Sequence, residues 1–179
     1  NKLIKESMID GLNEYGNGAS ASHLISGHYQ IHDELESFAA KIVGFDRSLI
    51  FSSGYSANIG VIPSICGKGD VIFSDKLNHA SLNEACTLSH AKFLRFAHND
   101  MGNLEHLLMQ QTSNRKVIVS DAVFSMDGDI ANLPKILDLC TKYNAYLYLD
   151  DAHGYGVLGK TGQGVIEYFE EKSLIKRNS

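Results

Sequence analysis

The residues best suited to chemistry lie in the segment YLYLDDAHGYGVLGKTGQG, at positions 146–164. An apolar run ends there in two adjacent carboxylates, Asp150 and Asp151, and His153 follows. A carboxylate at the end of a buried strand keeps its charge only when a cationic group pairs with it. The protonated nitrogen of a pyridine ring is such a partner, and a nearby histidine can bond the ring's phenolic oxygen. The D-x-x-H pattern therefore fits pyridoxal phosphate chemistry, although taken alone it favours a structural polar pair, and the interpretation depends on the other motifs of the chain.

The same segment matches a second pattern, G-x-x-x-x-G-K-T, between Gly154 and Thr161. A phosphate-binding loop of this kind needs a strand that runs directly into its first glycine and a helix that opens at the lysine. Two carboxylates precede the loop here, and Gly162 and Gly164 follow it, which disfavours the start of a helix. A P-loop nucleotide-binding protein is therefore the weaker of the two interpretations.

Three further segments carry polar side chains that suit a phosphorylated aromatic cofactor. FSSGYSAN places Ser53 and Gly54 ahead of a predicted helix, where backbone N–H groups suit a phosphate, and Tyr55 adds a hydroxyl or a ring. SDKLNHAS places His79 after the next strand, where its imidazole can lie against an aromatic ring or can instead cap a helix. VFSMDGD supplies Ser125, and the acids that follow it are typical of a turn.

These segments each follow a short apolar run, and the runs alternate with helical patterns. Predicted strands cover 48–53, 70–75, 92–96, 116–121 and 145–150, and predicted helices cover 31–43, 54–65, 79–90, 103–111 and 132–143. The alternation predicts an α/β fold, a three-layer α/β/α sandwich with a mostly parallel sheet. Ligands of such sheets bind outside the carboxyl ends of the strands, which is where the polar segments lie.

The domain organisation expected is an N-terminal segment, residues 1–30, that leads into one domain over residues 31–179. Leu35 and Phe38 belong to an apolar stripe that predicts a core-facing helix over 31–43, ended by Gly44. The charged tail EEKSLIKRNS, residues 170–179, stops without a clear final element.

Composition excludes several classes of protein. The chain has 179 residues, 44% of them apolar, and its net charge of −5 comes with 16 scattered basic residues. Neither nucleic acid nor a membrane is expected as a partner, and without a signal peptide pattern or a span of ~20 apolar residues we expect a cytoplasmic protein. The three cysteines are widely spaced and predicted to be buried, reduced thiols. His28 and His32 lack a third ligand, so no metal site is predicted.

Taken together, the motifs SSGYSAN, DKLNHASL, FAHND, VFSMDGD and DDAHGYGVLG closely resemble those of the α-oxoamine synthases, which are fold type I pyridoxal phosphate enzymes. The resemblance extends from about Gly16 to about Gly164. It implies pyridoxal 5′-phosphate as cofactor and a homodimer with active sites at the subunit interface. It is strongest to the branch that condenses L-alanine with a pimeloyl thioester, of coenzyme A or a carrier protein, with decarboxylation, in biotin biosynthesis. Relatives that use glycine are the alternative within the family.

The resemblance also assigns roles to residues, beginning with a cofactor-binding set: Ser53, Gly54, Tyr55, His79, Ser125, Asp150 and His153. Within this set it implies that His79 stacks on the ring and meets substrate, that Asp150 pairs with the ring nitrogen, and that His153 bonds the phenolic oxygen. These three are the expected catalytic residues. Among them, the ion pair of Asp150 is the contact on which each carbanionic step relies.

The chain departs from the family pattern at several positions. Tyr155 and His23 stand where many members have threonine and arginine, and Asp121 stands where glutamate is usual. No lysine has the setting of the family's Schiff-base lysine, since Lys160 comes too early along the chain. We therefore expect a fragment that lacks this lysine and the small C-terminal domain and is inactive alone. A truncated paralogue that only associates with other chains is the remaining alternative.

Overall fold

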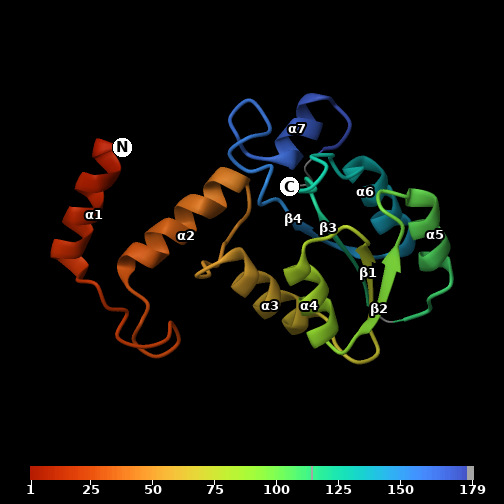
Figure 1. Cartoon of the computed structure of the whole chain (residues 1–179), viewed down its shortest axis with the longest axis horizontal. Coiled ribbons are helices and arrows are strands. Elements are labelled where there is room, and N and C mark those ends of the chain that lie inside the picture. The colour runs from red at the N-terminus through yellow and green to blue at the C-terminus, as the bar shows by residue number, and fades with distance from the viewer. Residues whose placement is uncertain (114, 177–179) are drawn as a thin grey trace. The chain divides into compact units, whose positions relative to one another are not determined.

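The computed structural model describes residues 1–113 and 115–176, and it divides the chain into two compact units. The first unit is residues 1–50 and the second is residues 51–179. The predicted boundary at residue 30 thus lies inside the first unit. Each unit is described by itself (Figure 1).

The first unit is built on two helices, α1 (Lys2–Tyr15) and α2 (Gln30–Val43). Helix α2 matches the predicted helix over 31–43 and ends at Gly44, whose left-handed backbone closes the last turn. The expected burial of its stripe is wrong: Leu35 is 51% exposed and Phe38 is 62% exposed. The physical reason within this unit is that α1 buries no side chain, so the two helices form little shared core.

The second unit contains a four-stranded sheet of β1 (Val71–Asp75), β2 (Lys92–Phe96), β3 (Lys116–Asp121) and β4 (Tyr146–Asp150). All strand pairs are parallel and the order is β2-β1-β3-β4. The chain adds β2 on one side of β1 and then returns to the other side for β3 and β4. The direction of the connections therefore reverses between β1 and β3, and sheets of this kind bind ligands beside such a point.

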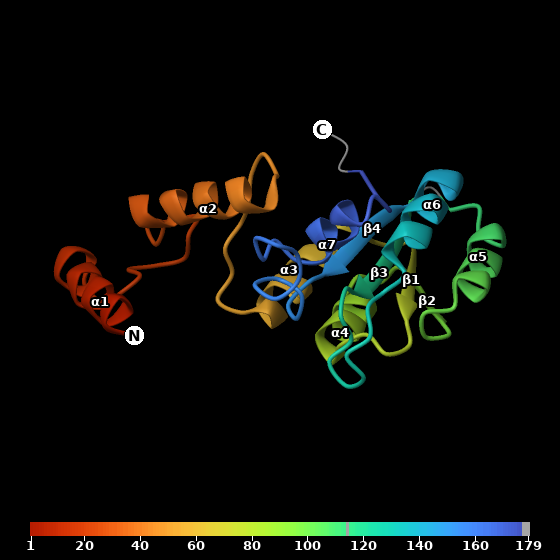
Figure 2. The ribbon, with the colours of Figure 1, turned by 90° about the horizontal axis from the view of Figure 1, so that it is seen from above.

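Helices cover both faces of this sheet, as Figures 1 and 2 show. Helices α3 (Gly54–Ile65) and α4 (Ala80–Leu88) pack on one face, in a core that includes Ile62, Leu82 and Val119. Helices α5 (Met101–Met109) and α6 (Leu133–Tyr143) pack on the other, around Phe73, Leu104 and Ile136. Because alternate residues of one strand face opposite layers, Ile72 joins the first core and Phe73 the second. The predicted three-layer sandwich is confirmed.

The prediction of a strand over residues 48–53, where the first unit ends and the second begins, is wrong. Residues 48–53 form no strand, and the side chain of Leu49 is 75% exposed. An apolar run becomes a strand only where a neighbouring strand pairs with its backbone, and none does here, so Asp150 closes the fourth strand and not a fifth. After residue 164 the chain forms α7 (Val165–Glu171), whose Val165 is fully buried with Ala122 and Leu133.

The three cysteines are free thiols in the structure. Cys66 and Cys86 are buried as predicted, whereas Cys140 is only half-buried. Over residues 1–113 and 115–176, no helix combines the length and apolar character needed to cross a membrane.

Candidate active site

Three of the four parallel strands end in an aspartate: Asp75 in β1, Asp121 in β3 and Asp150 in β4. Asp121 and Asp150 are register partners, so their carboxylates leave neighbouring strands at the same edge of the sheet. Carboxylates this close disfavour each other's ionised form unless hydrogen bonds or a cation compensate. The partners of each acid therefore decide what it can do.

Asp150 is half-buried and fixed through both carboxylate oxygens. Its Oδ2 accepts a hydrogen bond from Asn58 Nδ2 at 2.9 Å, and its Oδ1 accepts one from the backbone N–H of Ala152 at 3.1 Å. Each carboxylate oxygen has two acceptor sites, so capacity for a further donor remains. A positioned carboxylate with spare acceptor capacity is what a protonated ring nitrogen requires.

Asp151, the second acid of the pair, has a structural role. Its Oδ2 accepts the backbone N–H of Val165 at 2.8 Å, which caps the first turn of α7. A side-chain carbon at Gly154 would lie 2.1 Å from Asp151 Oδ1, and one at Gly164 would lie 2.0 Å from Oδ2. The two glycines thus leave room for this carboxylate. Burial, followed by the charge of Asp150, raises the pKa of Asp151, while the backbone donors lower it.

The start of helix α3, the helix whose Asn58 holds Asp150, offers an anion site. Ser53 caps the helix and its Oγ accepts the backbone N–H of Ser56 at 3.0 Å. Among the described residues, no protein acceptor receives the backbone N–H groups of Gly54 and Tyr55, and a side-chain carbon at Gly54 would meet no atom within 4 Å. Unpaired N–H groups and the positive end of a twelve-residue helix favour a phosphate.

The hydroxyl of Ser53, predicted to bind the cofactor, already accepts a hydrogen bond from the helix that it caps. Tyr55 is half-exposed and its hydroxyl donates to Glu84 Oε2 at 2.5 Å, which ties α3 to α4. That hydrogen bond raises the pKa of Tyr55, as does the charge of Glu84. Gly54 is the residue of the three whose predicted role meets no competing contact.

His79 lies at the carboxyl end of β1 and caps α4, so the capping alternative describes part of its role. Its Nδ1 lies 2.7 Å from Ser81 Oγ and 3.2 Å from the backbone N of Ser81. Its backbone N–H donates to Asp121 Oδ2 at 2.7 Å. The imidazole is exposed and its Nε2 has no protein partner in the described part of the chain. The ring is thus held at one nitrogen and open at the other.

Asp121 is the buried acid of the site, 7% exposed. Burial raises its pKa to about 6; the charge of Asp150 adds to this, while the His79 N–H and the charges of His79 and His153 oppose it. Asp150, His79 and His153 therefore all lie near enough to the Asp121 carboxyl to affect its pKa. Asp121 therefore changes charge near neutral pH beside the carboxylate of Asp150.

His153 and Ser125 complete the predicted set. His153 is exposed in the turn after β4 and close enough to Asp121 to lower its pKa. Ser125 is exposed in the turn after β3, where the Gly128 N–H donates to the Phe124 carbonyl at 2.8 Å. Both follow strands whose carboxyl ends carry the acids. The structure therefore brings His79, Asp150 and His153 together and places Ser125 on an adjoining loop.

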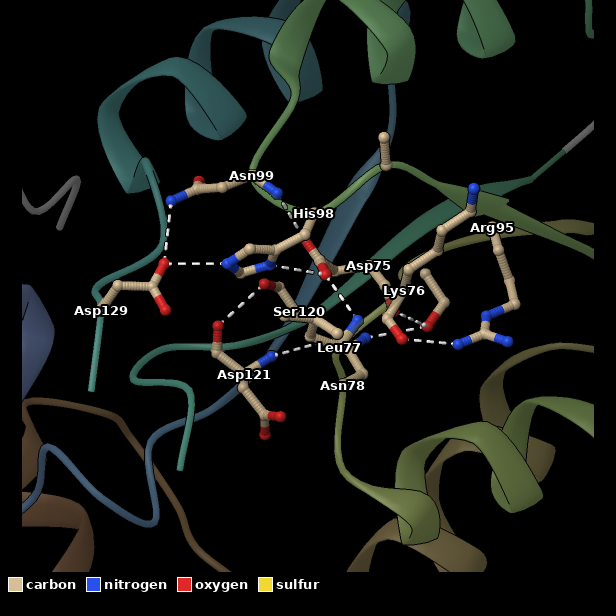
Figure 3. Close-up of polar contacts among 12 residues, drawn as sticks. Asp75, Lys76, Leu77, Asn78, Arg95, His98, Asn99, Ser120, Asp121 and Asp129 are labelled. Atoms are coloured by element: carbon tan, nitrogen blue, oxygen red, sulfur yellow. Dashed lines mark hydrogen bonds and ion pairs between the residues drawn. The ribbon is translucent and has the colours of Figure 1, made fainter. Parts of the chain in front are cut away.

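Sequence reasoning assigned no role to a second network, around His98 of the FAHND motif (Figure 3). His98 Nδ1 lies 3.0 Å from Asp75 Oδ1, and Nε2 lies 3.0 Å from Asp129 Oδ2. Burial lowers the pKa of His98, but the hydrogen bonds and charges of Asp75 and Asp129 outweigh it and raise the pKa. The network ties the loop that carries Ser125 to the end of β1. Figure 3 shows the Asp121 carboxylate pointing away from it.

The phosphate-loop interpretation does not fit the structure. Strand β4 ends at Asp150, four residues before Gly154, and the next helix begins at Val165, after the lysine–threonine pair. The backbone N–H of Lys160 donates to Glu171 Oε1 at 2.9 Å, and that of Thr161 to Glu167 at 3.2 Å. Carboxylates of α7 thus occupy the donors that a nucleotide phosphate would need.

A group of possible metal ligands lies in the first unit, where the sequence showed only two histidines. One ligand atom each from His28, Asp33 and Glu36 lies within 4.8 Å of the others. His28 Nε2 is 3.0 Å from Asp33 Oδ1, and Glu36 Oε1 accepts the N–H of Ile50 at 3.0 Å. These possible ligand atoms already pair with one another or with the backbone. The absence of a metal role stays a prediction.

The fold and the site are those of a pyridoxal phosphate enzyme, and comparison with known proteins agrees with this class. Residues 3–175 match the aminotransferase class I and II family, and the chain belongs to this family. Its curated relatives include the 8-amino-7-oxononanoate synthases of Methylobacillus flagellatus, 56% identical over 154 residues, and Geobacter sulfurreducens, 49% identical over 168 residues. These matches cover 86% and 93% of the chain but 39% and 43% of the relatives. The chain thus spans about two fifths of their length.

Solved structures give the same fold. The serine palmitoyltransferase of Sphingomonas wittichii superposes with a TM-score of 0.90 at 34% identity, covering 96% of this chain and 43% of that one. The 8-amino-7-oxononanoate synthase of Francisella tularensis has a TM-score of 0.76 at 32% identity, covering 93% and 45%. A serine palmitoyltransferase from S. paucimobilis, with a TM-score of 0.90, was solved with a ligand built on pyridoxal phosphate.

Pyridoxal phosphate is the cofactor of this class, and the residues of the chain fit it. The open N-terminus of α3 suits the phosphate, the Asp150 carboxylate suits the protonated ring nitrogen, and the exposed face of His79 suits the ring. The fit rests on the donor and acceptor types that the site leaves available.

Proposed function

We propose that this chain supplies the cofactor site of an 8-amino-7-oxononanoate synthase, which condenses L-alanine with a pimeloyl thioester. The observation that carries the proposal is the Asp150 carboxylate at the strand ends, held at 2.9 Å by Asn58 of α3, the helix whose first N–H groups are unpaired among the described residues. Identities of 56% and 49% to the Methylobacillus flagellatus and Geobacter sulfurreducens synthases support this substrate class. The Francisella tularensis synthase, at 32%, lies in the same range as the serine palmitoyltransferases at 31–34%, so the support comes from the first two relatives.

Each residue of the site has a distinct part in this proposal. The N–H groups of Gly54 and Tyr55 bind the phosphate, and Ser125 adds a hydroxyl from the neighbouring loop. His153 bonds the phenolic oxygen, and His79 lies on the ring, with its free Nε2 directed to substrate. Asp150 holds the proton on the ring nitrogen. Bound pyridoxal phosphate supplies the electron sink that makes the α-carbon of alanine acidic.

The balance of the reaction follows from the substrates. The α-carbon of L-alanine loses its proton and forms a bond to the acyl carbon of the thioester. The carbon–sulfur bond breaks, and the sulfur takes up a proton and leaves as the thiol of coenzyme A or of a carrier protein. The carboxyl group of alanine departs as carbon dioxide, and a proton replaces it. His79 is the side chain placed to move that proton, because its Nε2 has no protein partner within the described residues.

We also propose that the protein works in the cytoplasm as a homodimer, in line with the family resemblance. Apolar side chains support an assembly: Leu3, Ile4 and Met8 of α1 are all at least 60% exposed. Burying such side chains against another protein surface is favourable by about 25 cal/mol per Å². A second copy of the chain is the partner proposed.

The test uses a chimaera in which the segment that follows the matched region in the Methylobacillus flagellatus relative is joined after Ser179. With pyridoxal phosphate it should produce an absorbance band near the edge of the visible range, typical of the bound cofactor, and L-alanine should change the spectrum. The variant Asp150→Ala should lose all turnover of L-alanine and pimeloyl-coenzyme A and retain its fold by circular dichroism. Full activity of Asp150→Ala contradicts the proposed function.

Two further outcomes separate the alternatives. A spectral response to glycine and none to L-alanine would assign the chain to the glycine-using relatives. Lack of any response to pyridoxal phosphate in a folded chimaera would support the non-catalytic alternative. Thr141→Ala, an exposed change in α6 away from the strand ends, is the matched control and should leave spectrum and turnover unchanged.

A further inference from the structure

Asn58 lies at the centre of the candidate site and has no assigned role. It is 4% exposed on α3, one turn after Gly54. We propose that Asn58 is the positioning residue that holds the Asp150 carboxylate against the cofactor's ring nitrogen and, through Ser81, holds the imidazole of His79. This inference rests on the proposed cofactor site, and it adds a residue through which the parts of that site are linked.

Every hydrogen-bonding group of the Asn58 amide is used. Its Nδ2 donates to Asp150 Oδ2 at 2.9 Å and to Ser81 Oγ at 2.9 Å. Its Oδ1 accepts the hydroxyl of Tyr148 at 2.7 Å. An amide offers two donors at nitrogen and acceptor sites at oxygen, so these three contacts fix its position and its plane.

The contacts also fix which way the amide faces. If the amide were rotated by half a turn, Oδ1 would face the carboxylate of Asp150, and two acceptors would meet without a proton between them. The ionised carboxylate of Asp150 only accepts, so it requires Nδ2 on its side, and the Tyr148 hydroxyl then donates to Oδ1 at 2.7 Å. The orientation of Asn58 thus follows from Asp150, and Tyr148 is compatible with it.

The network continues to the ring face of the site. Ser81, 1% exposed, receives the second Asn58 proton, and its Oγ lies 2.7 Å from His79 Nδ1. If Ser81 donates its own proton to Nδ1, the imidazole keeps its proton on Nε2, which faces the open site. One buried amide therefore links the acid that meets the ring nitrogen to the histidine that meets the ring face.

The contacts predict an effect on one atom of the ligand. Without Asn58, Asp150 loses one of its donors and its fixed direction, so the contact with a ring nitrogen weakens. The contacts of the phosphate at Gly54 do not pass through this amide and should persist. A general packing role of Asn58 would instead weaken every ligand of the site to the same degree.

The experiment measures Kd for two probes by fluorescence titration of the 179-residue chain: pyridoxal 5′-phosphate and its 1-deaza analogue, which has carbon in place of the ring nitrogen. For Asn58→Leu, Kd for pyridoxal phosphate should rise roughly tenfold to a hundredfold, since a hydrogen bond to a charged group is removed. Kd for the 1-deaza analogue should change less than about threefold, within the ordinary scatter of such cycles.

Two matched pairs guard against a loss of folding. Tyr148→Phe removes one hydroxyl and should raise Kd for pyridoxal phosphate about threefold to tenfold, whereas Tyr146→Phe, on an exposed tyrosine of the same strand, should not. Ser64→Ala, on the exposed side of α3, is the control for Asn58→Leu. Circular dichroism verifies that each variant is folded. An equal rise of Kd for both probes in Asn58→Leu overturns the inference.

A wild-type chain that binds neither probe refutes the proposed cofactor site, and a second measurement then decides on Asn58. The carboxyl carbon resonance of Asp150 and the ring resonances of His79, observed by NMR without any ligand, should shift in Asn58→Leu and in Tyr148→Phe. They should stay in place in Ser64→Ala and Tyr146→Phe. Unchanged resonances in the first two variants refute the positioning role.

Discussion

Replacing Asp121 by asparagine should make the folding stability of the chain less dependent on pH. Asp121 is buried beside Asp150, and burial raises its pKa from 3.8 to about 6. The folded state therefore binds the proton more tightly than the unfolded chain does. The stability that follows from this is present below pH 3.8 and is lost as the pH rises through about 6.

The magnitude can be worked from the two pKa values. Their difference corresponds to a total of about 3 kcal/mol, and about 1.4 kcal/mol of it falls between about pH 5 and pH 7.5. The amide introduced by the substitution carries no charge at either pH, and its oxygen can still accept the backbone N–H of His79. Relative to wild type, Asp121→Asn should therefore gain about 1.4 kcal/mol between the two pH values, or about 3–6 °C in Tm.

Urea unfolding at pH 5 and pH 7.5 measures this effect. The quantity compared is the change in the free energy of unfolding between the two pH values, for wild type and for the variant, so that titration of all other groups cancels. Asp127→Asn, which removes an exposed carboxylate from the turn after β3, is the control and should follow wild type. If Asp121→Asn also follows wild type within about 0.5 kcal/mol, near the limit of such additivity, the pKa of Asp121 is not raised on folding.

Other regions of the second unit give further predictions. Phe73→Ala removes a fully buried ring from β1 and should lower the free energy of unfolding by about 3–5 kcal/mol in urea titrations; a loss below about 1 kcal/mol would contradict its central place in the core. Gly164→Ala should lower the free energy of unfolding by about 1–3 kcal/mol, because the φ of Gly164 is +90° and the new carbon would meet the Asp151 carboxylate. Differential scanning fluorimetry should show this as a lower Tm. The cysteines should react with Ellman's reagent at pH 8 only slowly until urea unfolds the chain, and rapid reaction of the folded chain would show that they are accessible. Burial raises the thiol pKa values to about 11 for Cys66, about 12 for Cys86 and about 11 for Cys140.

Much of the second unit was predictable from local sequence. The bounds of α3, β2 and β3 agree with the predicted ranges, which follow the local periodicity of apolar residues. The run at 48–53 has the same composition and is not a strand, since pairing depends on a neighbour that no local pattern supplies. Helix α7 was not predicted, because its buried Val165 is held by contacts with residues more than thirty positions earlier.

The residues of the candidate site were predictable where they directly follow a predicted strand. Asp150 and His79 follow apolar runs, and parallel strands bring such positions to one edge. Asn58 was not predictable, although it stands in the SSGYSAN motif, because its partner Tyr148 is 90 residues away and the contact depends on how α3 packs on the sheet. His98 was likewise visible as part of FAHND, but its pairing with Asp75 and Asp129 depends on the fold of two loops.

Helix α3 carries both the unpaired N–H groups at its start and, four residues later, the amide that holds Asp150. The rise of an α-helix makes this separation about 6 Å, and a rigid helix keeps it constant. The helix therefore sets a fixed distance between the N–H groups and the amide that holds Asp150. A ligand must match this distance to reach both the N–H groups and the Asp150 carboxylate. A homologue of pyridoxal phosphate with one more methylene between ring and phosphate should be excluded by size, even though every group that it offers to the protein is unchanged.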